Sequence, residues 1–342
     1  MKIELLPEHW NAYKVNFHCH TNISDGKFSP EEIKYAYKKM GYSAVCFTDH
    51  EVLLTHPDLC DEDFIALHGY EVAIKQNIGE HSGCFMPVYH FNLIPRSKNT
   101  KKMPLFFESN PSFPGNAKEW ADNCAEFDKV IDATVYDPTW IDEYLKTISE
   151  AGFLCVLNHP EWSLQDLHGC LSLQYLHGLE VFNGACILDG HHDGTSIHFD
   201  RFLRAGKRLV PTAGDDNHRK EHQGLAWTMV KAPALSYDAL IDSYEKGLCY
   251  VSEGPEIHGI SIVDDTVVVN TSPARKIVLL SEGRYTQHVT CRAETVTEAV
   301  FPYSPQKYGS YFRIEVRDTE GNYAYSPAYF IDELEAKTQE DT

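Results

Sequence analysis

The chain has 342 residues, of which 43% are hydrophobic and 12% aromatic, enough for one large domain and a smaller one with packed cores. Its formal net charge of -20, from 50 acidic and 30 basic residues, opposes binding to extended nucleic acid and to anionic membrane surfaces. This charge is compatible with a small phosphorylated substrate that metal ions hold.

Short apolar runs in the first 250 residues predict strands, the later ones separated by helical segments. The seven runs cover residues 14–18, 43–50, 65–73, 87–94, 153–160, 178–184 and 208–216. The clearest helix lies in SPEEIKYAYKKMG, where Ser29 and Glu32 form a capping box and Gly41 ends the helix. We expect mostly helix and loop over 110–151 and a further helix over 199–206. This alternation predicts a parallel sheet, and the number of units predicts that it closes into a barrel.

The pattern changes near VSEGPEIHG (251–259), after which apolar and polar residues alternate as in strands. The segment DTEGN (318–322) is typical of a hairpin turn. We therefore expect an α/β barrel followed by an all-β sandwich. The predicted parts are a barrel domain at 1–253, a sandwich at 254–332 and a polar, frayed tail at 333–342.

The ten cysteines are widely spaced, which indicates reduced thiols rather than a disulfide framework or a zinc finger. The start of the chain, MKIELLPEHWNAYK, lacks the apolar core of a signal peptide, and no apolar run has transmembrane length. We expect a soluble, cytoplasmic protein.

Two histidines close the first predicted strand, in VNFHCHTNISDG (15–26). Alternate residues of a strand share one face, so His18 and His20 would lie side by side with Asp25 close behind. Alone, this pair is slightly more typical of a partly exposed strand end than of a metal site. However, all seven predicted strands end in such groups, where parallel α/β barrels carry their functional residues. These groups are His18, His20, Asp49, His50, Glu71, His90, His159, Glu180, Asn183, Asp216 and His218.

Four motifs in this order resemble those of the polymerase and histidinol phosphatase (PHP) family of metal-dependent phosphoesterases. They are HCHTNISDG with TDH, GYE with VYH, NHP, and GDDNH, which together span residues 18–218, about two-thirds of the chain. The resemblance implies a distorted (βα)7 barrel, in agreement with the seven strands counted above. With its appended β-domain, the chain is similar to the carbaryl hydrolase-like branch.

By this resemblance, three metal sites would share the strand ends, and Glu71 would bridge the first two. The ligands would be His18, His20, Glu71 and Asp216 for the first metal, Glu71, His90 and His159 for the second, and Asp25, His50 and His218 for the third. The family's aspartate stands two residues before the histidine, which selects Asp216 over Asp215. Strand alternation agrees, and Asp215 would then support a ligand or contact solvent. The predicted catalytic residues are Glu71, Asp216 and His218.

Imidazole and carboxylate ligands without thiolate suit two or three zinc, manganese or iron ions. A hydroxide shared by such ions could attack a phosphoryl group in line. We therefore expect a phosphoesterase with a trinuclear site, acting on a small phosphorylated molecule. A carboxylic or carbamic ester hydrolase using the same site is an alternative, as is a metal-binding protein without catalysis. The sequence leaves the substrate, and whether the chain forms a homo-oligomer, open.

Two further residues are candidate substrate contacts. Asn183 ends a strand beside the predicted metals, where a substrate contact is favoured over a packing role. Arg219 directly follows His218, from where it could reach a phosphate, and a place at the surface is an equal alternative. Two other polar groups are more typical of exposed loops than of a lid or a second metal site. They are Lys98, Lys101 and Lys102, and the histidines His191, His192 and His198.

Overall fold

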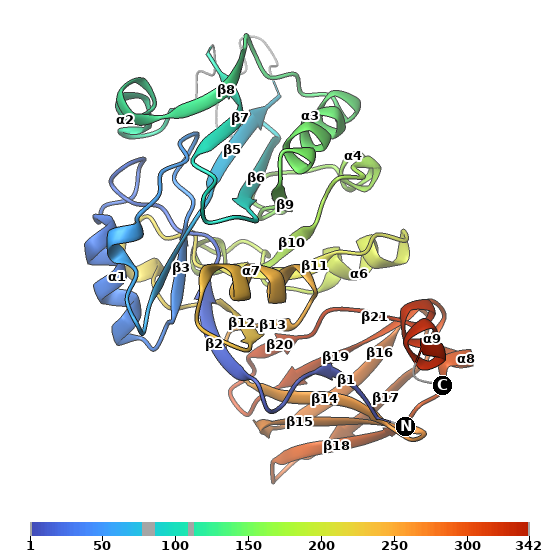
Figure 1. Cartoon of the computed structure of the whole chain (residues 1–342). Coiled ribbons are helices and arrows are strands. Elements are labelled where there is room, and N and C mark those ends of the chain that lie inside the picture. Colours follow the sequence, from blue (N-terminus) through green and yellow to red (C-terminus); the bar gives the residue numbers. More distant parts are fainter. Residues whose placement is uncertain (1, 77–85, 109–112, 341–342) are drawn as a thin grey trace.

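The fold is mixed α/β, as seen in a computed structural model that describes residues 2–76, 86–108 and 113–340 (Figure 1). All seven strands predicted in the first part of the chain are present, the third as two strands. They are β2 (Asn11–Asn16), β3 (Ala44–Phe47), β4 (Ile65–His68), β5 (Tyr70–Lys75), β6 (Val88–Pro95), β9 (Phe153–Leu157), β10 (Gly178–Asn183) and β11 (Val210–Gly214).

These strands belong to two sheets. One has the order β11-β10-β9-β6-β5, whereas β2, β3 and β4 end a ten-stranded sheet. Strand β6 is antiparallel to both β5 and β9, so the prediction of a parallel sheet is wrong at this strand. Strands β5 and β6 follow each other in the chain and pair directly from Tyr70↔Leu93 to Lys75↔Val88, an arrangement that needs no crossover helix.

The two sheets meet at two seams. At one seam only Gly69 separates β4 from β5, and a Cβ atom there would lie 2.9 Å from the Leu93 carbonyl oxygen. At the other, the Asp216 amide donates to the His18 carbonyl at 2.8 Å, and Cys19 and Asn217 form an isolated bridge. Isolated contacts replace a continuous ladder here, so the prediction of a closed barrel is not confirmed. The seams nevertheless bring the strand ends of both sheets together.

Helices cover the outside of these sheets (Figure 1). The capping box of Ser29 and Glu32 is confirmed at the start of α1. The described helices of this part are α1 (Pro30–Lys39), α2 (Ala117–Cys124), α3 (Pro138–Glu150), α4 (Leu167–Ser172), α5 (Gly184–Leu188), α6 (Ile197–Arg204) and α7 (Tyr237–Glu245), with 3-10 turns at Pro57–Leu59 and Lys220–His222.

The described residues 113–151 are mostly helix and loop, as expected, but they also contain one strand. This strand, β8 (Glu126–Ile131), pairs in parallel with β7 (Lys102–Phe107). The side chains of β8 are exposed apart from the half-buried Ile131, so the strand lacks the apolar face that would have predicted it.

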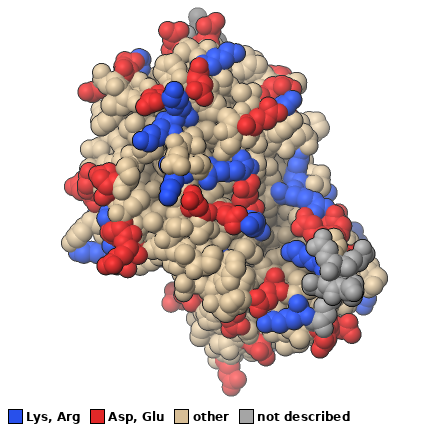
Figure 2. All heavy atoms as spheres, in the orientation of Figure 1, with Lys and Arg blue, Asp and Glu red and all other residues tan. Residues whose placement is uncertain are grey.

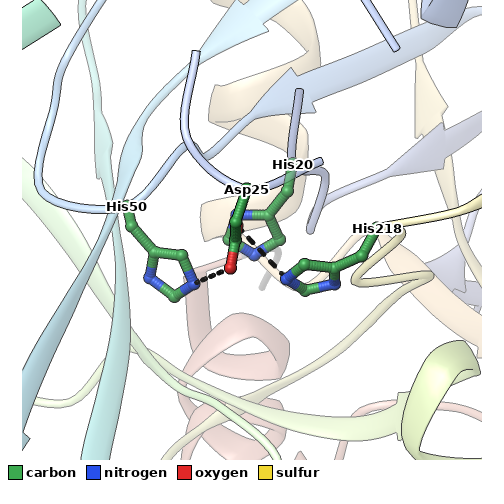
Figure 3. A group of neighbouring side chains, drawn as sticks. All are labelled: His20, Asp25, His50 and His218. Atoms are coloured by element: carbon green, nitrogen blue, oxygen red, sulfur yellow. Dashed lines mark ion pairs between the residues drawn. The ribbon is translucent and has the colours of Figure 1, made fainter. Parts of the chain in front are cut away.

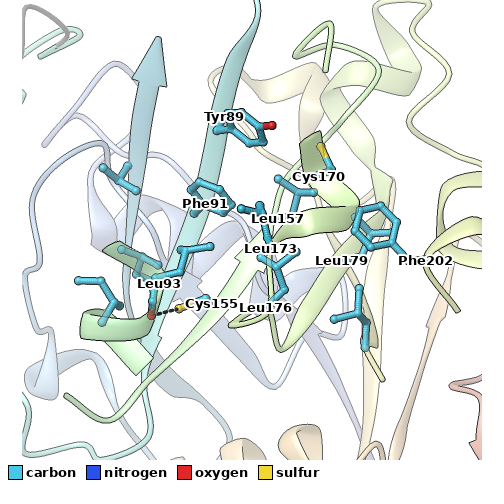
Figure 4. Packing of buried hydrophobic residues seen from close by; sticks show 14 of the residues in the cluster. Tyr89, Phe91, Leu93, Cys155, Leu157, Cys170, Leu173, Leu176, Leu179 and Phe202 are labelled. Carbon is cyan, nitrogen blue, oxygen red and sulfur yellow. Dashed lines mark hydrogen bonds between the residues drawn. The ribbon is translucent and has the colours of Figure 1, made fainter. Parts of the chain in front are cut away.

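The largest apolar core lies beside the five-stranded sheet. Figure 4 shows Phe91 and Leu93 of β6 packed near Leu157 of β9, with Leu173 and Phe202 from the covering helical side. The Cys155 thiol donates to the Leu145 carbonyl of α3. This packing makes the five-stranded sheet a fixed support for the side chains at its ends.

Most of the remaining strands form the C-terminal part, where an apolar cluster lies between two sheets. They are β1 (Lys2–Leu6), β12 (Trp227–Ala232), β13 (Cys249–Ser252), β14 (Ile257–Val263), β15 (Thr266–Ala274), β16 (Lys276–Ser281), β17 (Thr286–Thr290), β18 (Val296–Pro302), β19 (Tyr311–Arg317), β20 (Tyr323–Tyr325) and β21 (Tyr329–Phe330), with the short helix α8 (Pro305–Tyr308). The predicted DTEGN hairpin joins β19 to β20.

The ten-stranded sheet runs without interruption from β16 and β19 through β13 and β12 into β2. A separate β-sandwich is therefore not confirmed, and the division at residue 253 stays a prediction. The expectation of a frayed tail is wrong as far as Glu340, because α9 (Ile331–Glu340) is helical and Leu334 on it is buried.

Acidic and basic side chains lie interspersed between large uncharged areas on the face shown in Figure 2. Within the described residues, no helix has both the length and the apolar character needed to cross a membrane.

Candidate metal centre

The buried Glu71 carboxylate at the start of β5 lies at the centre of a cluster of histidines. Each of five imidazoles has a ring nitrogen within 3.3 Å of one or the other of the two Glu71 oxygens. These are His18 Nε2 at 3.3 Å, His20 Nε2 at 3.3 Å, His50 Nδ1 at 3.2 Å, His90 Nδ1 at 3.0 Å and His159 Nε2 at 3.3 Å. One carboxylate among five imidazoles is an arrangement suited to bridging two cations.

All nine predicted ligands come together here. Four groups have ligand atoms that all lie within 4.8 Å of one another: His18, His20 and Glu71; His18, His159 and Asp216; Glu71, His90 and His159; and His20, Asp25, His50 and His218. Figure 3 shows the last group, in which His50 and His218 point toward Asp25 from opposite sides. The groups share members, so the structure brings the three predicted sites into one cluster.

Several buried polar atoms in the cluster would have suitable partners if cations were bound there and lack them otherwise. Asp25 Oδ1, His90 Nδ1 and Asp216 Oδ1 are buried without a hydrogen bond of good geometry. The Nε2 atoms of His18 and His20 face each other at 3.2 Å. Leaving such groups unpaired is costly, whereas divalent zinc, iron or manganese accepts imidazole and carboxylate together.

The backbone is also unusual at two of these residues. His159 has a φ of 21° and Asp216 a φ of 49°, both on the positive side that non-glycine residues rarely adopt. Strain of this kind gathers at sites where function requires an exact side-chain position.

The charges of the cluster depend on one another. Burial opposes the charged form of Glu71, yet the surrounding histidines, His90 and His18 foremost, hold its pKa well below the usual value. Burial likewise opposes protonation of His20, but Asp216 and Glu71 raise its pKa to about 10. The pKa of His50 falls to about 3 through burial and the neighbouring His20. The carboxylates are therefore ionised, as metal ligands must be.

A second set of side chains orients the ligands. Glu180 Oε1 lies 2.9 Å from His18 Nδ1, and its Oε2 accepts from the amides of His159 at 3.1 Å and Asn183 at 2.9 Å. Ser163 Oγ lies 3.0 Å from His159 Nδ1. Glu180 and Ser163 thus engage the Nδ1 atoms of His18 and His159, and the Nε2 atom of each ring is left to face the cluster.

The two other strand-end aspartates hold loops. Asp49 accepts from the Thr21 amide at 2.7 Å and from the Ser24 hydroxyl at 2.7 Å, which fixes the loop that carries Asp25. The buried Asp215 accepts from backbone amides of residues 224–226 and from the Tyr37 hydroxyl. Asp216 Oδ1 instead lies 3.0 Å from His20 Nε2, in agreement with the choice of Asp216 as the ligand.

The predicted substrate contacts have other partners in this structure. The buried Asn183 donates to Asp216 Oδ2 at 3.1 Å and to Glu180, and it accepts from the Cys186 amide. Arg219 lies at the surface, paired with Asp189 at 2.6 Å. Their roles toward a substrate stay predictions. Of the three histidines expected in a loop, His198 instead lies in the first turn of α6 and pairs with Glu161.

Sequence reasoning missed two side chains at the centre. Asn158 donates to Glu71 Oε1 at 2.7 Å, and its place directly before His159 in NHP was the signal available. Trp162 packs its indole against the rings of His90 and His159. No pattern in the sequence marked Trp162, because a loop tryptophan has no periodicity.

Comparison with known proteins agrees with the motifs. The model of the PHP domain family matches residues 16–178. No curated protein matches the sequence significantly.

Several solved structures are similar to this chain. One is a two-domain protein from Bacteroides vulgatus described as containing a predicted PHP-like metal-dependent phosphoesterase, with 15% identity, a TM-score of 0.44, and coverage of 95% of this chain and 98% of that one. Another is described as a metal-dependent phosphoesterase from Bifidobacterium adolescentis, with 18% identity, a TM-score of 0.38, and coverage of 62% and 90%. PsfC from Pseudomonas syringae has 15% identity, a TM-score of 0.40, and coverage of 68% and 88%.

Proposed function

We propose that the protein is a metal-dependent phosphoesterase that hydrolyses a small phosphorylated molecule, a proposal supported by the match of residues 16–178 to the PHP domain family. The observation that carries this proposal is the contact of the Glu71 carboxylate with five imidazoles, beside Asp25 and Asp216. Bound divalent ions would neutralise phosphoryl charge and acidify water for attack at neutral pH.

We assign the nine predicted ligands to three metal ions. Glu71 would hold two ions, the first with His18, His20 and Asp216 and the second with His90 and His159. Asp25, His50 and His218 would hold a third ion. In this arrangement Glu71, Asp216 and His218 act as the catalytic residues, because they fix the cations that face the phosphate.

Two further side chains would help to bind or position the substrate. Arg219 follows His218 and is 43% exposed, so its guanidinium could exchange Asp189 for a phosphate oxygen. Asn183 would act through its hydrogen bond to Asp216, which keeps that carboxylate aimed at the cluster. Zinc, manganese and iron are the candidate metals, because each accepts mixed imidazole and carboxylate ligands.

The test is phosphate release by the chelator-treated protein after addition of each metal. Nucleotide, sugar and inositol phosphates form the substrate panel, and aryl carboxylic and carbamic esters represent the rival hydrolase. Glu71→Gln should abolish phosphate release, whereas Glu298→Gln on the exposed face of β18 should leave it unchanged. Metal-dependent ester hydrolysis without phosphate release would favour the rival, and no metal-dependent activity would favour a binding protein.

A further inference from the structure

Trp162 covers one side of the candidate metal centre. Its ring centroid lies 5.5 Å from that of His90 and 5.0 Å from that of His159, the latter edge to face. The two imidazoles are buried, yet Trp162 is 42% exposed. Part of a large aromatic side chain is therefore presented to solvent directly beside two predicted ligands.

The position of this tryptophan is fixed by buried contacts. The carboxylate of Asp193, itself 4% exposed, accepts from the amides of Glu161 at 2.9 Å and Trp162 at 2.8 Å. The Asp193 carbonyl accepts in turn from the Asn183 amide at 2.8 Å. Trp162, in the segment after β9 that carries His159, is thus tied through Asp193 to the end of β10.

The same loop is also closed on itself. The Ser163 amide donates to the His159 carbonyl at 3.1 Å, and the Ser163 carbonyl accepts from the Val88 amide of β6 at 3.1 Å. The ligand His159 and the indole therefore belong to one rigid turn. A rigid aromatic side chain beside a polar centre offers contact area at low cost in conformational entropy.

The exposed indole of Trp162 and the metal centre beside it suit different parts of a phosphoester substrate. The cluster of carboxylates, imidazoles and cations suits the phosphate, whereas the indole offers a planar apolar face that favours stacking. We propose that Trp162 is a specificity-determining residue that stacks on an aromatic or heteroaromatic ring in the alcohol part of the substrate phosphoester. This inference rests on the proposed phosphoesterase function and names its substrate class.

The kinetic test compares phenyl phosphate with glycerol 1-phosphate on the metal-loaded protein. Trp162→Ala should raise KM for phenyl phosphate about 10-fold while KM for glycerol 1-phosphate stays within about 2-fold. Trp162→Phe keeps a ring and should restore most of the difference. Trp120→Ala, a control at an exposed tryptophan of α2, should behave as the wild type. Equal changes for both substrates, or no change for either, would overturn the inference.

A binding test separates this inference from the proposed function. In isothermal titration calorimetry of the metal-loaded protein, phenylphosphonate should bind the wild type more tightly than methylphosphonate does, and Trp162→Ala should remove the preference. If the wild type hydrolyses neither these two phosphates nor any phosphate of the panel above, the proposed function fails, and the binding test alone decides the stacking role. Equal affinity for the two phosphonates would overturn the stacking role even in an active phosphatase.

Discussion

The Nδ1 atom of His18 lies 2.9 Å from Oε1 of Glu180, and both side chains are buried. A carboxylate can only accept, so Nδ1 carries a proton toward Glu180 and Nε2 is the ring nitrogen left to face the cluster. The other Glu180 oxygen accepts from the amides of His159 and Asn183. Glu180 therefore orients two strand ends of the centre without belonging to any of the candidate ligand groups.

Glu180→Gln should weaken metal binding while leaving every predicted ligand in place. The amide group supplies donors where the carboxylate only accepted, so at least one of its three hydrogen bonds is lost. We expect metal affinity to fall about 10- to 100-fold, the range for partners that orient a ligand histidine. Titration with a competing chelator measures the affinity, and Glu161→Gln at the exposed rim serves as control. An unchanged affinity would show that His18 is oriented by other means.

The number of bound metals should depend on which ligand is removed. Elemental analysis of the purified protein should find at least two equivalents, and Glu71→Gln should lose more than one because this carboxylate touches two candidate groups. His218→Asn should lose one equivalent at most, since His218 belongs to the group around Asp25 alone. Equal losses in the two variants would disagree with a bridging role for Glu71.

The C-terminal part is joined to α6 by a buried ion pair that should contribute to stability. Arg313 of β19 is fully buried and donates to Asp200 through Nε at 2.8 Å and Nη2 at 2.9 Å. Arg313→Met leaves a carboxylate without its partner and should lower the free energy of unfolding by about 3 kcal/mol. Arg208→Met, which breaks an exposed pair with Asp332, should cost less than about 1 kcal/mol. Urea unfolding measures both, and similar losses would contradict the assigned importance of burial.

The stability of the fold should fall in mild acid partly through His68. Burial lowers the pKa of this histidine to about 4, below the value of about 6.5 in an unfolded chain. The unfolded state therefore binds the extra proton between these values, so the stability present above pH 6.5 is lost as the pH falls toward 4.

Replacement of His68 isolates this effect. Between pH 7.5 and 5, the wild type should lose about 2 kcal/mol more unfolding free energy than His68→Leu. Urea unfolding in the presence of chelator measures both proteins without a contribution from metal release. Parallel pH profiles would mean that His68 does not titrate differently in the folded chain.

Much of the centre was predictable because strand ends carry a simple signal. Most ligands follow an apolar run, and the alternation of side chains placed His18 with His20 and separated Asp216 from Asp215. The expectation that every strand ends in such a group is wrong for Glu71 and His90, which lie near the starts of β5 and β6. Asp49 shows the limit of this signal. It ends a strand as Asp216 does, but amide and hydroxyl groups of residues 21–24 surround it, and that environment is visible only in three dimensions.

The direction of β6 and the seams between the sheets could not be read from the sequence. Both depend on hydrogen bonds between distant segments, such as that from the Asp216 amide to the His18 carbonyl. The role of Asp193 was also hidden, because a loop aspartate has many solvated equivalents. Only its burial and its two backbone donors distinguish it.

The most direct test of the phosphoesterase proposal compares p-nitrophenyl phosphate and p-nitrophenyl acetate, which share a leaving group, in the wild type and His218→Asn. A dianionic phosphate can approach Asp25, Glu71 and Asp216 only when cations hold these carboxylates, whereas a neutral ester depends on them less. We predict that wild-type phosphate hydrolysis exceeds acetate hydrolysis and falls roughly 100-fold or more in His218→Asn, with acetate hydrolysis largely spared. Faster acetate than phosphate hydrolysis in the wild type, with an equal fall of both in the variant, would contradict the account.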